Sequence, residues 1–143
     1  MRLLSAKTSE EATVQEIRIL IVDDHATFRR HVKEFLVSEP DIKVIGDAGD
    51  GKEGLLKARE LKPDVVLMDV RMPGISGIDA TRRLKDEMPE VKVIMLSLFD
   101  VREYREAAIA AGAKGYVVKE SLIKELVPAI NGLLSVGGKY ERG

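Results

Sequence analysis

The chain has 143 residues, 45% hydrophobic and 33% charged, and its 23 Lys and Arg residues nearly balance 24 Asp and Glu residues. This length suits one domain with a sizeable core. The net charge of -1 argues against binding nucleic acid or an anionic membrane through bulk positive charge. The absence of cysteine excludes disulfides and thiolate zinc sites. No apolar run approaches the roughly 20 residues that span a bilayer, so we expect a cytoplasmic protein without a membrane partner.

From residue 17 onward, short aliphatic runs alternate with longer segments whose apolar residues lie three and four positions apart. The short runs indicate strands buried on both faces, and the longer segments indicate amphipathic helices. The expected strands are 17–22, 42–47, 64–68, 91–97 and 115–118. The expected helices are one from Ala26 with Phe28, Val32, Phe35 and Leu36 on one stripe, followed by 52–61, 77–87, 101–111 and 121–136. Five such pairs predict an α/β domain with a parallel sheet covered by helices.

The predicted domain occupies residues 17–136. Residues 1–16 lack sustained periodicity, so we expect a flexible extension or a short helix there. Two glycines end the last helix, and residues 137–143 are expected to begin a C-terminal linker. Pro128 falls inside the last helical pattern, where it should bend the helix or move its start by several residues.

Charged residues follow three of the expected strands at their carboxyl ends. Asp23 and Asp24 follow the first strand, Asp69 follows the third and Lys119 follows the fifth. Because the loops after parallel strands line one crevice, these residues can meet in one pocket. Three converging carboxylates require a cation, and oxygen ligands without cysteine or a well-placed histidine favour Mg²⁺ or Mn²⁺ over zinc. With the ammonium of Lys119 opposite, the pattern indicates a phosphoryl site.

Each of these residues alone has a simpler explanation. The acidic pair could cap the following helix, Asp69 could cap a turn, and Lys119 could be an ordinary solvated lysine. Because all of these residues lie at the carboxyl ends of strands, a shared pocket explains them better than three unrelated local roles. We interpret His25 as a surface residue rather than a phosphocarrier, and we assign no role to His31.

Four strings closely resemble the receiver domain of bacterial two-component response regulators. They are ILIVDDH (19–25), VVLMDVRMPGISG (65–77), VIMLS (93–97) and AGAKGYVVK (111–119). The VDDH opening, the GDAGDGKEGL segment and the closing LLSVGGKY are most similar to the LuxR/NarL-type subgroup. The resemblance implies a flavodoxin-like, CheY-like (βα)5 domain, with a five-stranded sheet of order 2-1-3-4-5 and helices on both faces.

The resemblance also implies a role for each pocket residue. Asp69 would be the nucleophile that takes a phosphoryl group from a sensor histidine kinase. Asp23, Asp24, Asp69 and the backbone carbonyl of Arg71 would hold Mg²⁺, with Mn²⁺ as an alternative. Lys119 would pair with a phosphoryl oxygen. The protein would phosphorylate and slowly dephosphorylate itself, without turnover of an external metabolite.

Two further residues would carry the response. Ser97 would bind a phosphoryl oxygen and pull its loop inward, while Tyr116 would turn from an outward to an inward rotamer. Taken singly, Ser97 could be a strand-end hydroxyl bonded to backbone and Tyr116 a half-buried core aromatic. The switch would alter a surface around the fourth helix, fifth strand and fifth helix, which an attached domain, a partner or a second copy binds.

Members of this subgroup usually carry a C-terminal helix-turn-helix domain, through which we expect any DNA contact and any control of transcription to occur. The sequence ends before such a domain, so we expect an isolated receiver portion or a natural single-domain regulator. Many receivers have a cis proline after the lysine, whereas Glu120 follows Lys119 here, and this leaves the loop geometry open. Arg71 and Phe99 are expected to flank the path of attacking water.

Two other functions use similar residues. An aspartyl-phosphate phosphohydrolase would need a second Asp two residues after its nucleophile, and Arg71 occupies that position. A phosphorylation-independent interaction module would have a vestigial pocket and would fail to bind Mg²⁺. Turnover of small phosphate esters distinguishes the first alternative, and metal binding distinguishes the second.

Overall fold

The computed structural model of the chain describes residues 16–135. The predictions for residues 1–16 and 137–143 therefore lie outside the described residues, apart from Glu16. Every expected strand and helix is present, and their ends agree with the expected ones within one residue. The elements are β2 Ile17–Val22, α1 Ala26–Leu36, β3 Ile42–Ala48, α2 Gly51–Leu61, β4 Val65–Asp69, α3 Gly77–Glu87, β5 Lys92–Ser97, α4 Arg102–Ala111, β6 Gly115–Val118, the 3₁₀ turn η2 Lys119–Ser121 and α5 Leu122–Ser135.

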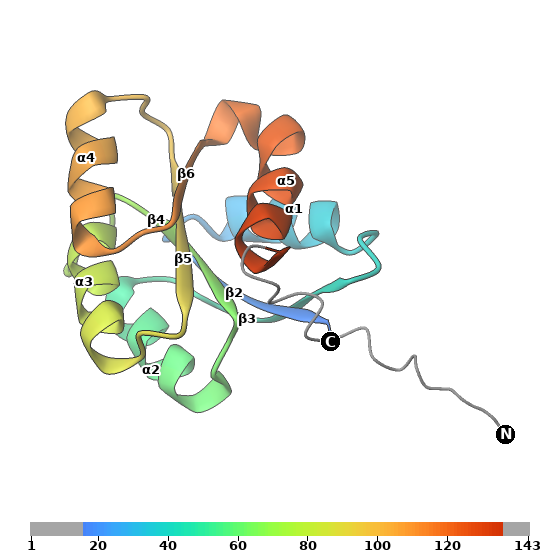
Figure 1. Cartoon of the computed structure of the whole chain (residues 1–143), viewed down its shortest axis with the longest axis horizontal. Helices are drawn as coiled ribbons and strands as arrows, with labels where there is room; N and C mark the ends of the chain where they lie inside the picture. Colours follow the sequence, from blue (N-terminus) through green and yellow to red (C-terminus); the bar gives the residue numbers. More distant parts are fainter. Residues whose placement is uncertain (1–15, 136–143) are drawn as a thin grey trace, which may run out of the picture.

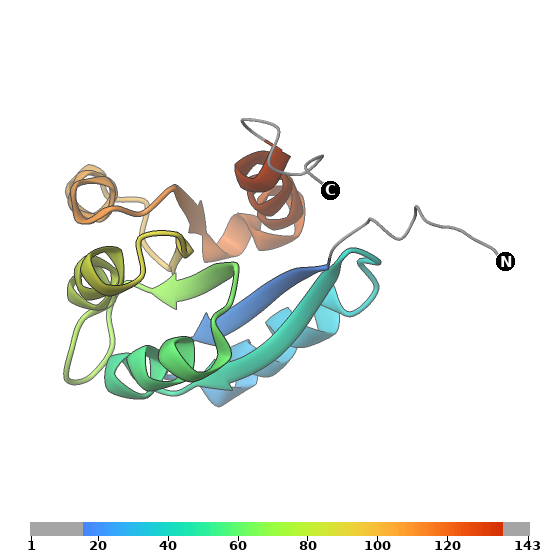
Figure 2. The ribbon, with the colours of Figure 1, turned by 60° about the horizontal axis from the view of Figure 1, so that its bottom comes forward.

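The five strands form one parallel sheet in the spatial order β3-β2-β4-β5-β6. Counted along the chain, this is the order 2-1-3-4-5 that the family resemblance implied, so that prediction is confirmed. Helices α1 and α5 cover one side of the sheet, and α2, α3 and α4 cover the other (Figure 1). Figure 2 shows the same layers from a second direction, with the strands twisted across the sheet.

The alternation of side chains along the central strands builds two cores. On β2, Ile19 and Ile21 pack toward α1 and α5, whereas Leu20 and Val22 pack toward α2 and α3. All four are fully buried. Because β2 from Ile19 onward and all of β4 are buried on both faces, the acidic side chains appear only at the carboxyl ends of these strands. The fold thereby confines the functional residues to one edge.

Helix α5 starts at Leu122 and continues through Pro128 to Ser135. The expectation that Pro128 moves the helix start by several residues is therefore wrong. Proline lacks the N–H that would bond to the carbonyl of Lys124. Pro128 lies on the exposed side of the helix, so water can satisfy that carbonyl. On the opposite side, Leu126 and Ile130 are fully buried and hold the helix against the sheet.

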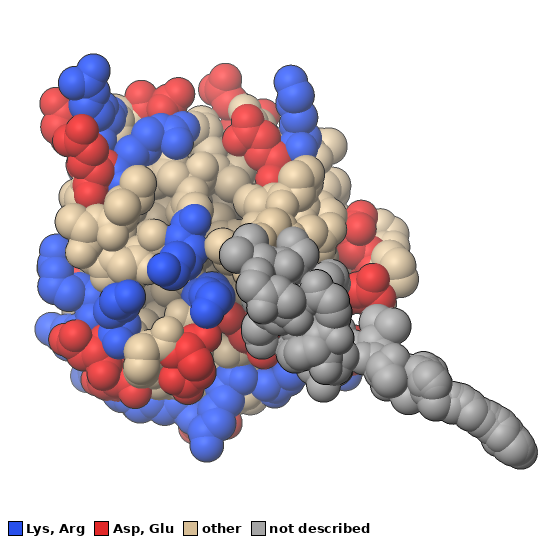
Figure 3. Space-filling model, in the orientation of Figure 1, with Lys and Arg blue, Asp and Glu red and all other residues tan. Residues whose placement is uncertain are grey.

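Positive and negative side chains are interspersed on the face seen in Figure 3. The described residues of this face form no continuous basic patch, which agrees with the balanced charge of the sequence. Among residues 16–135, no helix combines the length and apolar character needed to cross a membrane.

Candidate functional site

The register of the sheet brings the predicted site residues together. Val22 on β2 lies opposite Met68 on β4, so the next residues, Asp23 and Asp69, leave the sheet side by side. On the other side of β4, Asp69 lies opposite Leu96 of β5. Strand β5 then places Ser97 opposite Val118 of β6, which directly precedes Lys119.

Asp23 is 1% exposed and both of its carboxylate oxygens have partners. Its Oδ2 accepts a hydrogen bond of 2.7 Å from Lys119 Nζ, and its Oδ1 accepts one of 2.8 Å from the backbone N–H of His25. The backbone N–H of Asp23 donates to the carbonyl of Ala48 at the end of β3. The Lys119 ammonium also lies 4.2 Å from the centre of the Phe28 ring. Asp23 and Lys119 therefore form a buried ion pair that is held from several sides.

Asp69 is a buried carboxylate whose surroundings disfavour its charge. It is 6% exposed, and its Oδ2 lies 3.6 Å from Lys119 Nζ. Burial raises the pKa of Asp69 to about 6, and the negative charges of Asp23 and Asp24 act in the same direction. Lys119 and a backbone hydrogen bond from Arg71 oppose this rise without cancelling it. The ionised Asp69 lacks sufficient positive charge around it, and a bound cation would supply that charge.

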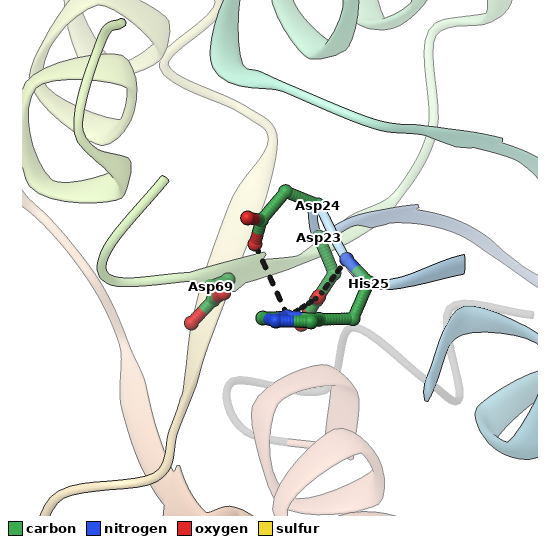
Figure 4. A group of neighbouring side chains, drawn as sticks. All are labelled: Asp23, Asp24, His25 and Asp69. Carbon is green, nitrogen blue, oxygen red and sulfur yellow. Dashed lines mark hydrogen bonds and ion pairs between the residues drawn. The ribbon is translucent and has the colours of Figure 1, made fainter. Parts of the chain in front are cut away.

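Asp24 and His25 complete the acidic side of the site (Figure 4). Carboxylate oxygens of Asp23, Asp24 and Asp69 and a ring nitrogen of His25 all lie within 4.8 Å of one another. Asp24 Oδ1 is buried and has no hydrogen-bond partner among the described residues. His25 Nδ1 approaches this oxygen to 3.3 Å, but without the geometry of a hydrogen bond. An unpartnered buried oxygen beside two other carboxylates is the donor arrangement that a hard divalent cation completes.

Two expectations from the sequence need correction here. His25, and not either aspartate, occupies the N-cap position of α1, and no side chain caps that helix. The simpler explanation of the acidic pair as helix caps is therefore wrong. His25 is a surface residue as expected, with 65% of its side chain exposed, but its ring faces the acidic group. The statement that the chain has no well-placed histidine is also wrong.

Ser97, the last residue of β5, and Tyr116, on the neighbouring strand β6, share one hydrogen-bond partner. The buried Ser97 Oγ accepts a hydrogen bond of 3.0 Å from the N–H of Phe99. Tyr116 Oη donates a hydrogen bond of 2.8 Å to the carbonyl of Phe99. The guanidinium of Arg105 lies 4.6 Å from the centre of the Tyr116 ring. Both hydroxyl groups thus hold the backbone of the β5–α4 loop at a single residue.

A pocket of about 280 Å³ opens beside Asp69 and is lined by His25, Asp69, Arg71, Ser97, Leu98 and Phe99. Arg71 lies 5.7 Å above the Phe99 ring. Arg71 and Phe99 thus line the access to Asp69, at the positions expected to flank attacking water. The described chain contains no cis peptide bond, so the Lys119–Glu120 bond is trans, and Lys119 begins the turn η2.

Sequence reasoning missed three contacts of this site. It placed Phe28 only on a core stripe, whereas its ring also supports Lys119. It did not foresee that Lys119 pairs with Asp23 before any phosphoryl group arrives. The position of His25, directly after the acidic pair, was the available signal for its approach to the carboxylates. The individual roles assigned to the site residues remain predictions at this point.

Comparisons with known proteins agree with the site. The model of the response regulator receiver domain matches residues 19–131. The response regulator GacA of Pseudomonas viridiflava is 44% identical over 87% of this chain and 58% of its own length. The transcriptional regulatory protein DegU of Brevibacillus brevis is 38% identical over 92% of this chain and 56% of its own length. The chain thus spans just over half the length of these curated relatives.

A solved structure gives the same result. The two-component response regulator of the LuxR family from Aurantimonas sp. SI85-9A1 superposes with a TM-score of 0.81 and 34% sequence identity. The superposition covers 85% of this chain and 86% of that one. Together with the matched sheet order and the acidic edge, these likenesses establish that the chain belongs to the response regulator receiver domain family, in its LuxR/NarL-type subgroup.

Proposed function

We propose that Asp69 accepts a phosphoryl group from the phosphohistidine of a sensor histidine kinase, and that the chain uses this modification as a switch. Receiver domains are phosphoacceptor switches, and the proposal here is which residue of this chain accepts the phosphoryl group and which residues assist the transfer. One observation carries the assignment: the buried Asp69 lies at the end of the central strand β4, with Lys119 at 3.6 Å and two further aspartates in its group. In these surroundings the ionised form of Asp69 is stabilised by a nearby cation.

The transfer requires a carboxylate nucleophile and neutralisation of the incoming charge. A carboxylate oxygen of Asp69 forms the new bond to phosphorus while the bond from phosphorus to the donor imidazole nitrogen breaks. The imidazole leaves with the electron pair and takes up a proton, and Asp69 becomes an acyl phosphate. Lys119 Nζ lies between hydrogen-bond contact with Asp23 and a 3.6 Å approach to Asp69, so its ammonium can pass from Asp23 to a phosphoryl oxygen.

Asp23, Asp24, Asp69 and the backbone carbonyl of Arg71 would hold Mg²⁺, and Mn²⁺ would fit the same oxygen donors. The buried and unpartnered Asp24 Oδ1 and the raised pKa of Asp69 both support this assignment. When bound, the ion screens the repulsion between Asp69 and the anionic phosphoryl group. The protein residues contribute the rigid placement, since Asp23 is fixed through Lys119, His25 and Ala48.

The switch would operate through Phe99. In the present structure, Ser97 Oγ holds the Phe99 N–H and Tyr116 Oη holds the Phe99 carbonyl. The Ser97 hydroxyl, which accepts the bond from Phe99, would donate its own proton to a phosphoryl oxygen on Asp69 in a charge-assisted hydrogen bond, and rotation of Oγ toward that oxygen would weaken its bond with the Phe99 N–H. Once Ser97 turns toward the phosphoryl group, the loop moves and Tyr116 leaves its present acceptor. The surface of α4, β6 and α5 would then change its binding properties.

The downstream partners are also part of the proposal. Relatives of this chain include a transcriptional regulatory protein, so we propose that phosphorylation controls transcription through a DNA-binding domain. Formation of a homodimer on phosphorylation and slow loss of the phosphoryl group by self-catalysed hydrolysis complete the proposed cycle. A cytoplasmic location stays a prediction from the sequence.

The test uses acetyl phosphate as a small phosphodonor and intact-mass spectrometry as the readout. We expect the wild-type chain to gain one phosphoryl group with Mg²⁺ and none with EDTA. Asp69→Asn should gain none, whereas Asp86→Asn, which changes an exposed carboxylate of α3, should behave as wild type. An adduct of equal yield on Asp69→Asn would refute the assignment. Rapid turnover of small phosphate esters would favour a phosphohydrolase instead.

A further inference from the structure

The ring of His25 lies against the acidic group, although most of its side chain is exposed. Its Nδ1 is 3.3 Å from Asp23 Oδ1 and also 3.3 Å from Asp24 Oδ1. Figure 4 shows the ring next to the carboxylate of Asp23 and below that of Asp24, with one edge toward Asp69. A nitrogen at the same distance from two carboxylate oxygens is placed to be the third ligand of an ion that both oxygens bind.

The separations match a coordination sphere. Two donors bound at right angles, with bonds of about 2.1 Å, lie about 3.0 Å apart, and donors on opposite sides lie about 4.2 Å apart. The two observed separations of 3.3 Å correspond to neighbouring donors, and the whole group of four stays within 4.8 Å. The limit of 4.8 Å exceeds the separation of donors on opposite sides of an ion, so movements of about half an ångström would bring one oxygen from each aspartate and the His25 nitrogen around a single ion.

The backbone of His25 is fixed in this position before any ion binds. Its N–H donates to Asp23 Oδ1 at 2.8 Å, and its carbonyl accepts the first hydrogen bond of α1 from Arg29 at 3.0 Å. The side chain makes no capping hydrogen bond, so the helix does not need the ring. Its only hydrogen-bonding contact among the described residues is the one from Nδ1 to Asp23 Oδ1. The exposed part of the ring leaves Nε2 able to carry the proton in contact with water.

We propose that Nδ1 of His25 is a direct ligand of the divalent cation, and that it shifts the preference of the site toward first-row transition ions such as Mn²⁺ and Co²⁺ relative to Mg²⁺. Imidazole nitrogen binds these ions better than it binds Mg²⁺, for which oxygen ligands are preferred. On binding, the proton of the imidazole resides on Nε2 and the lone pair of Nδ1 faces the ion. The inference rests on the proposed function, because it concerns the same cation, but it adds a ligand and a metal preference.

The most direct test is pulsed electron paramagnetic resonance of Mn²⁺ bound to the untagged chain. A coordinated imidazole gives a ¹⁴N modulation that oxygen ligands do not give. We expect this modulation in the wild type and in His31→Ala, which removes the other histidine of the chain from an exposed position on α1. His25→Ala should lose the modulation, and it should still fold because the ring caps nothing.

Affinities provide a second readout. We expect His25→Ala to lower the ratio of Mn²⁺ to Mg²⁺ affinity by at least about tenfold, a loss that removal of even a supporting residue can cause at metal sites. Mn²⁺ bound by the wild type without ¹⁴N modulation would overturn this inference and leave the phosphoacceptor proposal intact. Failure of the wild type to bind either ion would overturn both. Modulation that persists in His25→Ala would assign the nitrogen elsewhere and refute the role of His25.

Discussion

Replacement of Asp69 by asparagine should stabilise the metal-free protein at neutral pH. The folded protein raises the pKa of this carboxyl from 3.8 to about 6, mainly because it is buried and secondarily because Asp23 is close. Each unit by which the pKa rises corresponds to about 1.4 kcal/mol, so ionised Asp69 lowers the stability of the folded state by up to about 3 kcal/mol. This cost already includes the attraction to Lys119, which lowers the pKa of Asp69, but a buried asparagine amide costs part of the gain where its N–H groups lack acceptors. We therefore expect a net gain of about 1 to 2 kcal/mol in the free energy of unfolding.

The gain should depend on pH in a defined direction. Because the pKa of Asp69 is higher in the folded state, the folded protein binds this proton more tightly than the unfolded chain does. The loss of stability caused by Asp69 is therefore absent below about pH 4, where the carboxyl is protonated in both states, and complete above about pH 6. Urea unfolding in EDTA at pH 7.5 and pH 4.5 measures the difference between the two proteins. The reasoning is refuted if Asp69→Asn is the less stable protein at pH 7.5, or if its advantage is equal at both pH values.

Three further predictions concern the surroundings of Asp69. Mg²⁺ should raise the melting temperature of the wild type in proportion to the logarithm of its concentration, and Asp24→Asn should abolish most of this rise, as differential scanning calorimetry would measure. Tyr116→Phe should cost less than about 1 kcal/mol of stability but should shift the amide NMR signals around Phe99, and unchanged signals would contradict the shared tether. Gly77→Ala should lower the free energy of unfolding by about 1 to 3 kcal/mol and slow phosphorylation, because a Cβ at that position collides with the backbone carbonyl of Asp69. A variant that unfolds in urea and is phosphorylated like the wild type would disprove this close packing.

The architecture could be predicted from the sequence because each element has a strong local signal. Strand β4 consists of aliphatic residues that end at Asp69, and the following Pro73 and Gly74 mark a turn. In a parallel sheet such a strand is buried on both faces, so its polar residue lies at the carboxyl end of the strand. Pro128 was harder to interpret, because its effect on α5 depends on whether its side of the helix faces water.

The candidate site was only partly predictable. The shared edge of Asp23, Asp69 and Lys119 follows from the rule that loops after parallel strands meet, which requires no knowledge of side-chain directions. The pairing of Lys119 with Asp23 and the direction of the His25 ring depend on rotamers and on packing by residues distant in sequence, such as Phe28. Sequence patterns report the period of a helix or strand, but they do not report these contacts.

The convergence of Ser97 and Tyr116 on Phe99 illustrates the same limit. The family resemblance indicated both residues as switch residues, yet it did not indicate that their hydroxyl groups hold the two sides of one residue. That arrangement arises because β5 and β6 are neighbours and the loop after β5 passes between the two hydroxyl groups. It supplies a physical link between the pocket beside Asp69 and strand β6.

The position of the phosphoryl group tests the central proposal most directly. Borohydride reduction of the phosphorylated chain converts an aspartyl phosphate to homoserine, which tandem mass spectrometry of the peptides locates. We predict homoserine at position 69 alone, formed only when Mg²⁺ accompanied the phosphodonor. Homoserine at position 23 or 24, or a stable phosphoryl group on a histidine with Asp69 unmodified, would contradict the account.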